Sequence, residues 1–430
     1  MKMKRIPPIY ILFFLSAFNC NLFSQAGNSY VIVPVGLGEY LTGVAKGNLG
    51  YIAARFNVSI AEAAQRAARV FPDPDLSFSY SNNEDNKLQM GQSYDAGLSY
   101  RIKTGNVRKA GIEKAGTETD LSRLILESYF RNLRADAAKS YYASLRNLHI
   151  LNLQKETLLQ LNRIASADSI RLRAGEATEL NAIQTSLEAS LQLHNVLESQ
   201  SYLENSQVTL SVLQGRNVRD SLLMPEDDFP SDNREFLLFQ LLDSALSRRT
   251  EVMVALTATE LQRKNFNLLK ADRAFEFSIE AGYSYSTIVK NEIAPAPAFN
   301  AVSTGLSFPL KFSNLNKGEL NAAEYAVSQS KTYEKEAELQ IKAEVMTAFN
   351  NYLACRKKVE SFNSQMTENA EKILNGRIKA YQTGESGLIE LLNARRTYTE
   401  LRMHQIESLF EYTAALIDLE RAAGIWDLSE

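Results

Sequence analysis

Phe78-Ser-Tyr-Ser81 and Tyr283-Ser-Tyr-Ser286 are the segments that decide the fold of this 430-residue chain, because the second nearly repeats the first. Their central tyrosines, Tyr80 and Tyr285, lie 205 positions apart. Further matches keep the same order at offsets of 208 or 209 positions: Gly97-Leu-Ser99 with Gly305-Leu-Ser307, Gly175-Glu176 with Gly384-Glu385, and Gly215 with Gly424. Since chance matches would not preserve order and spacing, we infer an internal duplication.

Four segments alternate apolar and polar residues with the period of two that is typical of a strand with one buried face. In the first of them, Leu76, Phe78 and Tyr80 alternate with serines. We expect strands at about 74–81, 93–103, 274–286 and 301–311. Their lengths approach the roughly 9–11 residues of a tilted membrane-spanning strand, and aromatic residues lie toward their ends. A soluble sandwich would show the same alternation, but four strands in a chain this rich in helix favour membrane strands.

Four strands are too few to close a barrel. An open sheet edge in lipid would leave backbone N–H and C=O groups unpaired, at a cost of several kcal/mol each. Closure therefore requires other chains, and three copies would supply twelve strands around a lumen. We predict a mainly α-helical fold with a small membrane β-barrel that is completed in a homotrimer.

Two long stretches without proline, Gly116–Ala167 and Gly318–Tyr381, indicate helical rods. At 1.5 Å per residue, the second rod would be roughly 95 Å long. Each half of the chain then reads as a helix, two strands and two long helices. The expected divisions are a signal peptide (1–25), a first repeat (26–215), an irregular linker that forms an equatorial belt partway along the rods (216–249), a second repeat (250–424) and a short tail (425–430).

The N-terminus has the pattern of a secretory signal. Lys2, Lys4 and Arg5 precede the apolar run Ile9–Phe18, which is too short to span a bilayer as a helix. Cys20 is a candidate for lipidation, although the residue before it, Asn19, is a poor match to a lipoprotein cleavage site. The formal net charge of −3 gives no electrostatic reason to bind nucleic acid.

Signs of catalysis or tight metal binding are missing from the sequence. His149, His194 and His404 are isolated from one another, and the only other cysteine is Cys355. Neither metal-ligand spacing nor a phosphate loop or nucleophile motif occurs. We therefore predict no catalytic residues, no metal site and no cofactor. A secreted enzyme on a helical scaffold would require a compact set of such residues.

Three segments are distinctive when taken together in this order: Val70-Phe-Pro-Asp-Pro-Asp-Leu76, Leu306-Ser-Phe-Pro-Leu310 with Gly318, and Tyr381-Gln-Thr-Gly384 with Leu391-Leu-Asn-Ala-Arg395. The set resembles the outer-membrane efflux proteins of the TolC type, over about Leu37–Gly424. The resemblance implies a trimeric exit duct with a twelve-stranded barrel in the cell outer membrane and a helical tunnel in the periplasm. An oligomeric helical rod on the cell surface is the alternative, but it would not need two matched strand pairs.

The resemblance also implies partners and the residues that meet them. In this family the turns of two helical hairpins dock onto a periplasmic adaptor protein, which couples the duct to an inner-membrane pump. The matching positions are Arg171, Arg173 and Gly175 in the first half and Tyr381, Gly384 and Ser386 in the second. Glycine suits such a turn because it adopts left-handed backbone conformations without strain.

A gate is expected six residues after each of these glycines, where the family often places an acid facing the channel axis. The positions are Asn181 and Glu390, with Asn393 one helical turn further on. A ring of three carboxylates would favour cations over anions. Alternatively, Glu390 is an ordinary solvated residue paired with Arg395 or another neighbour. The tract Pro309–Glu319 is most similar to members serving heavy-metal pumps of the resistance-nodulation-division class, which implies divalent metal cations as cargo.

Overall fold

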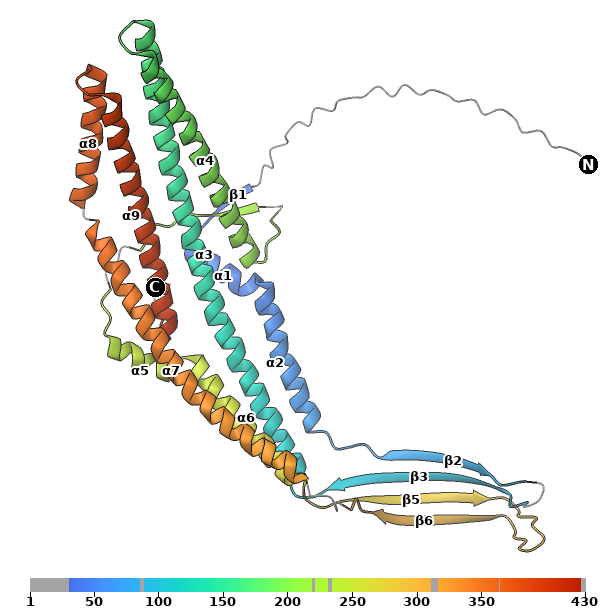
Figure 1. Ribbon diagram of the computed structural model, residues 1–430. Helices are drawn as coiled ribbons and strands as arrows, with labels where there is room; N and C mark the ends of the chain where they lie inside the picture. Colours follow the sequence, from blue (N-terminus) through green and yellow to red (C-terminus); the bar gives the residue numbers. More distant parts are fainter. Residues whose placement is uncertain are drawn as a thin grey trace, which may run out of the picture.

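Two helical hairpins and a four-stranded sheet lie at opposite ends of an elongated molecule (Figure 1). The computed structural model describes residues 31–426 except 86–88, 219–220, 231–233, 311–315 and 363. The expected signal peptide, with Cys20, therefore lies outside the described residues, as do residues 427–430 of the expected tail.

The four expected strands form one antiparallel sheet, in the order β2-β3-β5-β6. Their bounds are Asp75–Asn82, Gln92–Lys103, Glu276–Ser286 and Phe299–Ser307. In the register of the sheet, Tyr80 lies opposite Tyr94, which in turn lies opposite Tyr285. The last strand was expected to continue to 311, but it ends before Pro309, which has no backbone N–H to donate to a strand ladder.

The two faces of the sheet differ as the alternation predicts. Phe78, Tyr283 and Val302 lie on one row of the apolar face, and more than half of each side chain is exposed. On the polar face, Gly97 and Gly282 lie opposite each other and are flanked by serines. No element in the described part of the chain buries the apolar face.

The helices of the first half are α1 (Leu37–Gly47), α2 (Leu49–Ala68), α3 (Val107–Arg173) and α4 (Glu179–Leu213). Helix α3 is continuous over 67 residues, which corresponds to about 100 Å. It therefore links the sheet directly to the first hairpin turn.

The helices of the second half are α5 (Leu238–Arg248), α6 (Thr250–Ala271), α7 (Lys317–Ser361), α8 (Ser364–Thr383) and α9 (Leu388–Ala423). The prediction of one rod over Gly318–Tyr381 is wrong, because the helix is interrupted after Ser361. The Ser361 hydroxyl donates to the carbonyl of Lys358, and Phe362 leaves the helical conformation with ψ at 69°. A serine hydroxyl that bonds its own backbone competes with the helix, so the lack of proline did not guarantee a continuous rod.

The expected irregular linker is also wrong, since it contains regular structure. Strand β4 (Ser221–Pro225) pairs in parallel with β1 (Val31–Val35), and helix α5 follows. Leu222 and Leu223 of β4 are buried, and this burial stabilises the short strand. Asp227 then fastens the segment, because its carboxylate accepts hydrogen bonds from the Tyr141 hydroxyl (2.7 Å) and the Leu37 backbone N–H (2.6 Å).

One order of neighbours recurs along the whole molecule. Near the hairpin turns the order is α4-α3-α9-α8, near the sheet it is α2-α3-α6-α7, and within the sheet it is β2-β3-β5-β6 (Figure 1). Elements of the first half thus form one edge of the molecule, and elements of the second half form the other.

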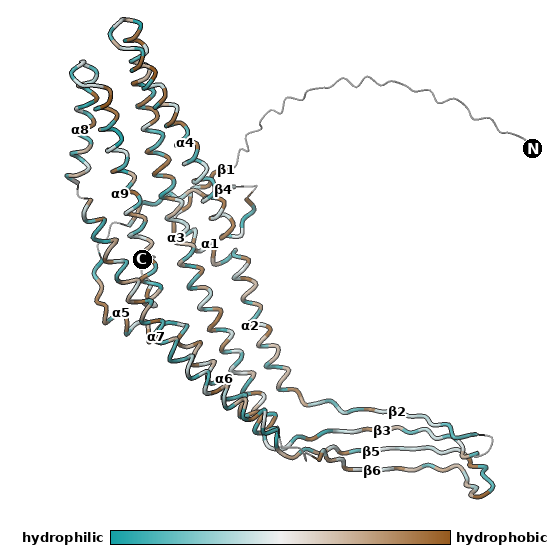
Figure 2. The backbone as a smooth tube through the Cα atoms, viewed as in Figure 1, coloured by the Kyte–Doolittle hydropathy of each residue, from teal (hydrophilic) through white to brown (hydrophobic). Residues whose placement is uncertain are grey.

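Hydrophobic and hydrophilic residues are interleaved along the helices (Figure 2). Among the described residues, no helix has an apolar segment long enough to cross a membrane.

Candidate functional site at the hairpin turns

The first hairpin turn joins α3 to α4 through Gly175. This glycine has φ at +80°, a left-handed conformation that residues with a Cβ atom rarely adopt. The Gly175 and Glu176 N–H groups donate to the carbonyls of Leu172 (3.0 Å) and Arg171 (2.8 Å), which satisfies two acceptors at the end of the helix.

The second turn joins α8 to α9 in the same way. Gly384 has φ at +77°, and the Glu385 N–H donates to the Ala380 carbonyl at 2.8 Å. A Cβ atom added at Gly175 or Gly384 would meet no described atom within 4 Å. The left-handed backbone thus favours glycine at both positions, while the space outside each turn is open.

Tyr381 links the two hairpins just below their turns. Its hydroxyl donates to Oδ1 of Asp168 at 2.8 Å in a buried contact. Arg171 donates to the Tyr381 carbonyl at 3.3 Å, and its guanidinium lies over the tyrosine ring. Burial and the bond to Asp168 raise the pKa of Tyr381 well above its usual value, so the hydroxyl keeps its proton.

Two of the other expected turn residues bond only locally. Arg173 Nε donates to the carbonyl of Ser169 on its own helix, at 3.3 Å. The Ser386 hydroxyl donates to Glu390 at 2.8 Å, which ties the second turn to the first turn of α9. Neither contact crosses between the hairpins.

Glu390 is paired, but not with Arg395. Its carboxylate accepts from Arg377 of α8 as well as from Ser386, and about half of its side chain is exposed. The pairing with Arg395 that the sequence left open is therefore wrong.

The three expected gate residues make no hydrogen bonds to one another within the described chain. Asn181 lies in the first turn of α4, where its N–H donates to the Thr178 hydroxyl at 3.3 Å. Asn393 lines a groove between α9 and the α3–α4 hairpin, away from the Glu390 pairs.

Arg395 is instead a buried cation, with 4% of its surface exposed. Its Nη1 donates to the Thr157 carbonyl of α3 at 3.3 Å. Its Nε and Nη2 atoms are buried without a hydrogen-bond partner among the described residues. Burial lowers the pKa of Arg395 to about 10, so the side chain still carries its charge near neutral pH.

Comparison with known protein families identifies the family of this chain. The family model described as outer membrane efflux protein matches residues 49–216 and 241–425, which is most of the chain. The chain belongs to the outer membrane efflux protein family. As a member of this family, it is an efflux channel of the outer membrane.

Individual relatives of this efflux channel agree in extent and fold. The chain is 22% identical to the cobalt-zinc-cadmium resistance protein CzcC of Cupriavidus metallidurans over 93% of this chain and 94% of that protein. A crystal structure of CusC has a TM-score of 0.73 at 18% identity, and covers 94% of this chain and 96% of its own. The outer membrane channel CmeC of Campylobacter jejuni has a TM-score of 0.74 at 14% identity, with 90% and 85% covered.

Sequence analysis of this efflux channel missed Asp168 and the burial of Arg395. Asp168 lies seven residues after the buried Leu161, two turns further along the same helix face, so this spacing could have placed it in the interior. By the same reasoning, Arg395 lies seven residues after the buried Leu388 and four after the buried Leu391, a spacing that the exposed Arg396 does not share. Within the described residues, no group of three or more His, Cys, Asp or Glu side chains could hold a metal ion.

Proposed function

We propose that this protein is one subunit of a homotrimeric exit duct, which passively conducts substrates that a periplasmic adaptor and an inner-membrane pump deliver. The observation that carries this proposal is the repeated order of neighbours. The helices near the turns, the helices near the sheet and the sheet itself each end in an uncovered edge on both sides. Head-to-tail joining of identical copies would cover each edge with the opposite edge of the next copy.

The sheet supports this arrangement by its strand directions. Strand β2 is antiparallel to β3, β3 to β5, and β5 to β6, so β6 runs opposite to β2. Pairing β6 of one copy with β2 of the next keeps every neighbour antiparallel. The ring closes without an edge, and three copies give a twelve-stranded barrel whose exposed apolar face meets outer-membrane lipid.

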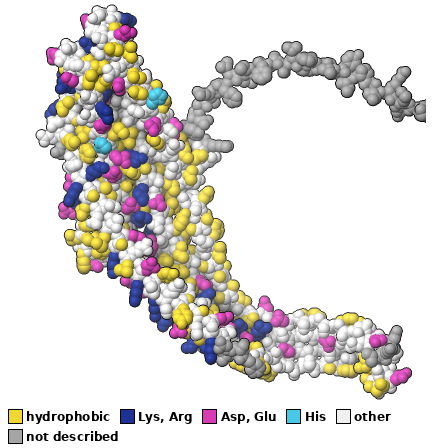
Figure 3. Space-filling model, viewed as in Figure 1, with side chains coloured by type: hydrophobic (Ala, Val, Ile, Leu, Met, Phe, Trp, Pro, Cys, Tyr) yellow, Lys and Arg dark blue, Asp and Glu magenta, His cyan; other side chains and the backbone are white. Residues whose placement is uncertain are grey.

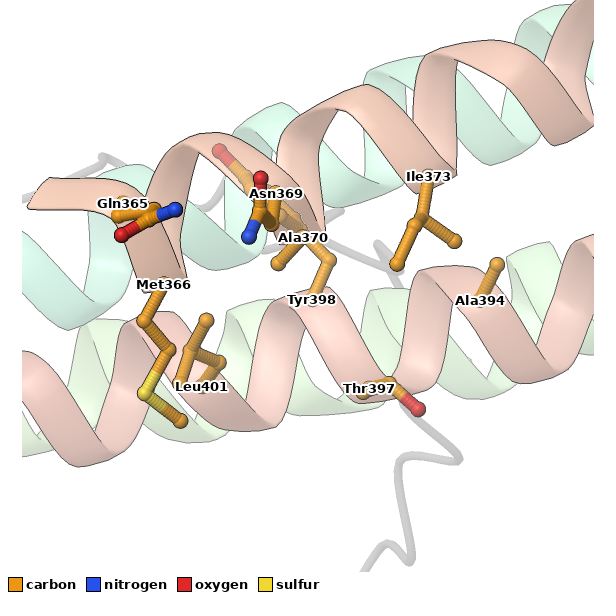
Figure 4. A pocket seen from close by; sticks show the side chains of 9 residues that line it. All are labelled: Gln365, Met366, Asn369, Ala370, Ile373, Ala394, Thr397, Tyr398 and Leu401. Carbon is orange, nitrogen blue, oxygen red and sulfur yellow. The ribbon is translucent and has the colours of Figure 1, made fainter.

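The helices offer matching surfaces on the two edges. On α4, Leu180, Ile183, Leu187 and Leu191 follow a spacing of three or four residues, and each is more than half exposed. At the other edge lies a groove between α8 and α9 whose lining includes the exposed Met366 and Ile373 (Figure 4).

Exposed apolar side chains also continue toward the sheet. Phe56 and Ile60 of α2 lie on the first edge, and Tyr333 and Leu339 of α7 on the second. Hydrophobic side chains are spread among charged ones over much of the visible helical surface (Figure 3). Burial of these edge residues between copies would stabilise the ring.

The hairpin turns are the proposed docking points for the adaptor. Their backbone is closed by left-handed glycines, and the space outside both turns is open. Arg173 and Gly175 of one turn and Gly384 and Ser386 of the other would meet the partner, while Arg171 and Tyr381 hold the hairpins together beneath it.

The proposed gate combines the Glu390 position with this link between the hairpins. In a trimer, Glu390, Asn393 and Asn181 would each occur three times around the axis. The Tyr381–Asp168 contact would keep the α8–α9 hairpin against α3, in the closed arrangement. Opening then requires that this buried hydrogen bond be broken.

Divalent heavy-metal cations are the proposed cargo, and a pump of the resistance-nodulation-division class is the proposed energy source. The support is the similarity to CzcC, whose name states cobalt, zinc and cadmium resistance. A duct conducts best when its sites hold the ion weakly. We assign no catalytic role and no cofactor to the chain.

Cross-linking tests the head-to-tail ring. In a chain carrying Cys355→Ser, Ile183→Cys on α4 and Ile373→Cys on α8 would be combined, and membranes would be treated with a flexible bismaleimide. We expect denaturing gels to show a ladder that ends at three chains. Each single cysteine variant is the matched control and should give monomers only, because a head-to-tail interface joins two different surfaces.

Two results would contradict the proposal. Dimers formed by a single cysteine variant would indicate a two-fold interface between equal surfaces. A ladder that continued beyond three chains would indicate an open assembly, not a closed trimer.

A further inference from the structure

A groove between α3 and the α8–α9 hairpin combines apolar walls with cationic side chains. Its volume is about 490 Å³. Ile164 of α3, Ile378 of α8 and Leu391 of α9 contribute to the walls. Arg395 also lines the groove, so a buried charge borders these apolar walls.

The free atoms of Arg395 indicate what chemistry the groove would take. Nη1 is occupied by the Thr157 carbonyl, which leaves Nε and Nη2 without a partner in the described chain. These two nitrogens share the edge of the guanidinium that donates two parallel hydrogen bonds to a carboxylate. A buried charge without a counterion is costly, so an oxyanion at this edge would be strongly favoured.

The other charged groups around the groove leave it cationic. Arg163 and Arg171 line it together with Arg395, and among the described residues of the lining Asp168 is the only acid. Asp168 already accepts the Tyr381 hydroxyl through Oδ1. Three guanidinium groups against one carboxylate favour an anionic ligand over a cationic one.

We propose that this groove binds a small amphipathic organic anion. The guanidinium of Arg395, whose Nε and Nη2 are closed off from the groove in the structure, would turn toward the ligand and bond to its carboxylate, while the alkyl body lies along Ile164 and Ile378. Such a ligand contacts α3, α8 and α9 at once. It would therefore hold the two hairpins together on the sheet side of the Tyr381 link, farther from the turns. This site differs in charge from the proposed cation path, since its ligand is an anion.

Ligand-observed NMR with hexanoate tests the site, on the full mature protein in lipid nanodiscs with empty nanodiscs subtracted. Hexanamide has the same shape without the charge, and acetate has the charge without the apolar body. We expect both to bind at least tenfold more weakly than hexanoate. Equal binding of hexanamide would overturn the role of the guanidinium, and equal binding of acetate would overturn the role of the apolar walls.

Two variants assign the binding to the groove. Arg395→Met removes the donors with little change in volume and should weaken hexanoate binding at least tenfold. Arg396→Met, at the exposed neighbour that pairs with Glu400, is the matched control and should leave binding unchanged. Ile378→Glu keeps Arg395 but adds a repelling carboxylate, and it should also weaken binding tenfold. Unchanged hexanoate binding in Arg395→Met or Ile378→Glu would overturn the proposal.

Discussion

The two halves of the duplicated chain differ most in how the sheet is connected to each hairpin. Helix α3 continues without interruption from the sheet to the first turn, whereas the corresponding path in the second half is divided into α7 and α8 at Phe362. A continuous helix resists bending, while an interruption in the hydrogen-bond ladder allows it. We therefore expect the second hairpin to move more readily than the first.

The contacts that restrain the second hairpin lie near its turn. Leu374, Tyr381, Leu388 and Leu391 form a small core at its end. The hydrogen bond from Tyr381 to Asp168 then joins that core to α3. The two hairpins thus share the same turn, but only the path to the second is interrupted, and Tyr381 of the second hairpin bonds to α3.

The largest expected effect concerns the turns, in which the two hairpins are still alike. Gly384→Trp places a bulky side chain into the open space where the adaptor is proposed to dock. We expect efflux to be abolished, as measured by metal accumulation in cells, while trimers persist on mildly denaturing gels. Gly175→Trp should have the same effect if both turns dock equally.

Backbone strain must be separated from bulk in this experiment. Gly384→Asn is the control, because asparagine tolerates the left-handed conformation of this position better than other residues with a Cβ. It should retain most of the efflux. Normal efflux in Gly384→Trp would remove the docking assignment for the second turn.

The sequence predicted the shared features of the halves better than their differences. Alternation and repeated glycines gave the four strands and both turns, because each depends on local backbone and side-chain periodicity. The break at Phe362 could not be predicted, since it depends on how Ser361 bonds to the preceding turn. Spacing from buried leucines could have placed Asp168 and Arg395 on interior helix faces. Their partners there, Tyr381 and Thr157, lie more than 200 positions away, and periodicity does not identify them.

A smaller effect is expected when the Tyr381–Asp168 hydrogen bond, which holds the second hairpin against α3, is removed. Tyr381→Phe removes the donor to Asp168 and leaves a buried carboxylate oxygen unsatisfied, at a cost of about 1–3 kcal/mol. We expect the closed arrangement to become less populated and the conductance in planar bilayers to rise several-fold. Tyr202→Phe is the matched control on the first hairpin, where an exposed hydroxyl bonds to Glu198, and its conductance should be unchanged.

The raised pKa of Tyr381 sharpens this test. Because the folded-state pKa exceeds the ordinary value of about 10, the stabilisation by this hydrogen bond is complete below that pH and is lost only as the pH rises through the higher value. The difference between Tyr381→Phe and the parent protein should therefore stay constant from pH 6 to about pH 9. Equal conductance of the two proteins over this range would contradict the role of Tyr381 in holding the second hairpin against α3.

The smallest expected effect comes from Glu390, whose contacts lie entirely within the second hairpin. Glu390→Ala removes an exposed pair with Arg377, and exposed pairs contribute only about 0–1 kcal/mol. It also removes three negative charges from the proposed trimeric gate. We expect conductance to rise by less than in Tyr381→Phe, with a lower preference for cations in a salt gradient.

Glu400→Ala is the matched control for Glu390→Ala, because it breaks an exposed pair with Arg396 on the same helix. Neither conductance nor cation preference should change in it. If Glu390→Ala behaves like this control, Glu390 is an ordinary paired surface residue. The hydrogen bond from Tyr381 to Asp168 alone would then account for closure. If its cation preference falls while the conductance rises only slightly, Glu390 determines ion selectivity and the Tyr381–Asp168 hydrogen bond determines closure.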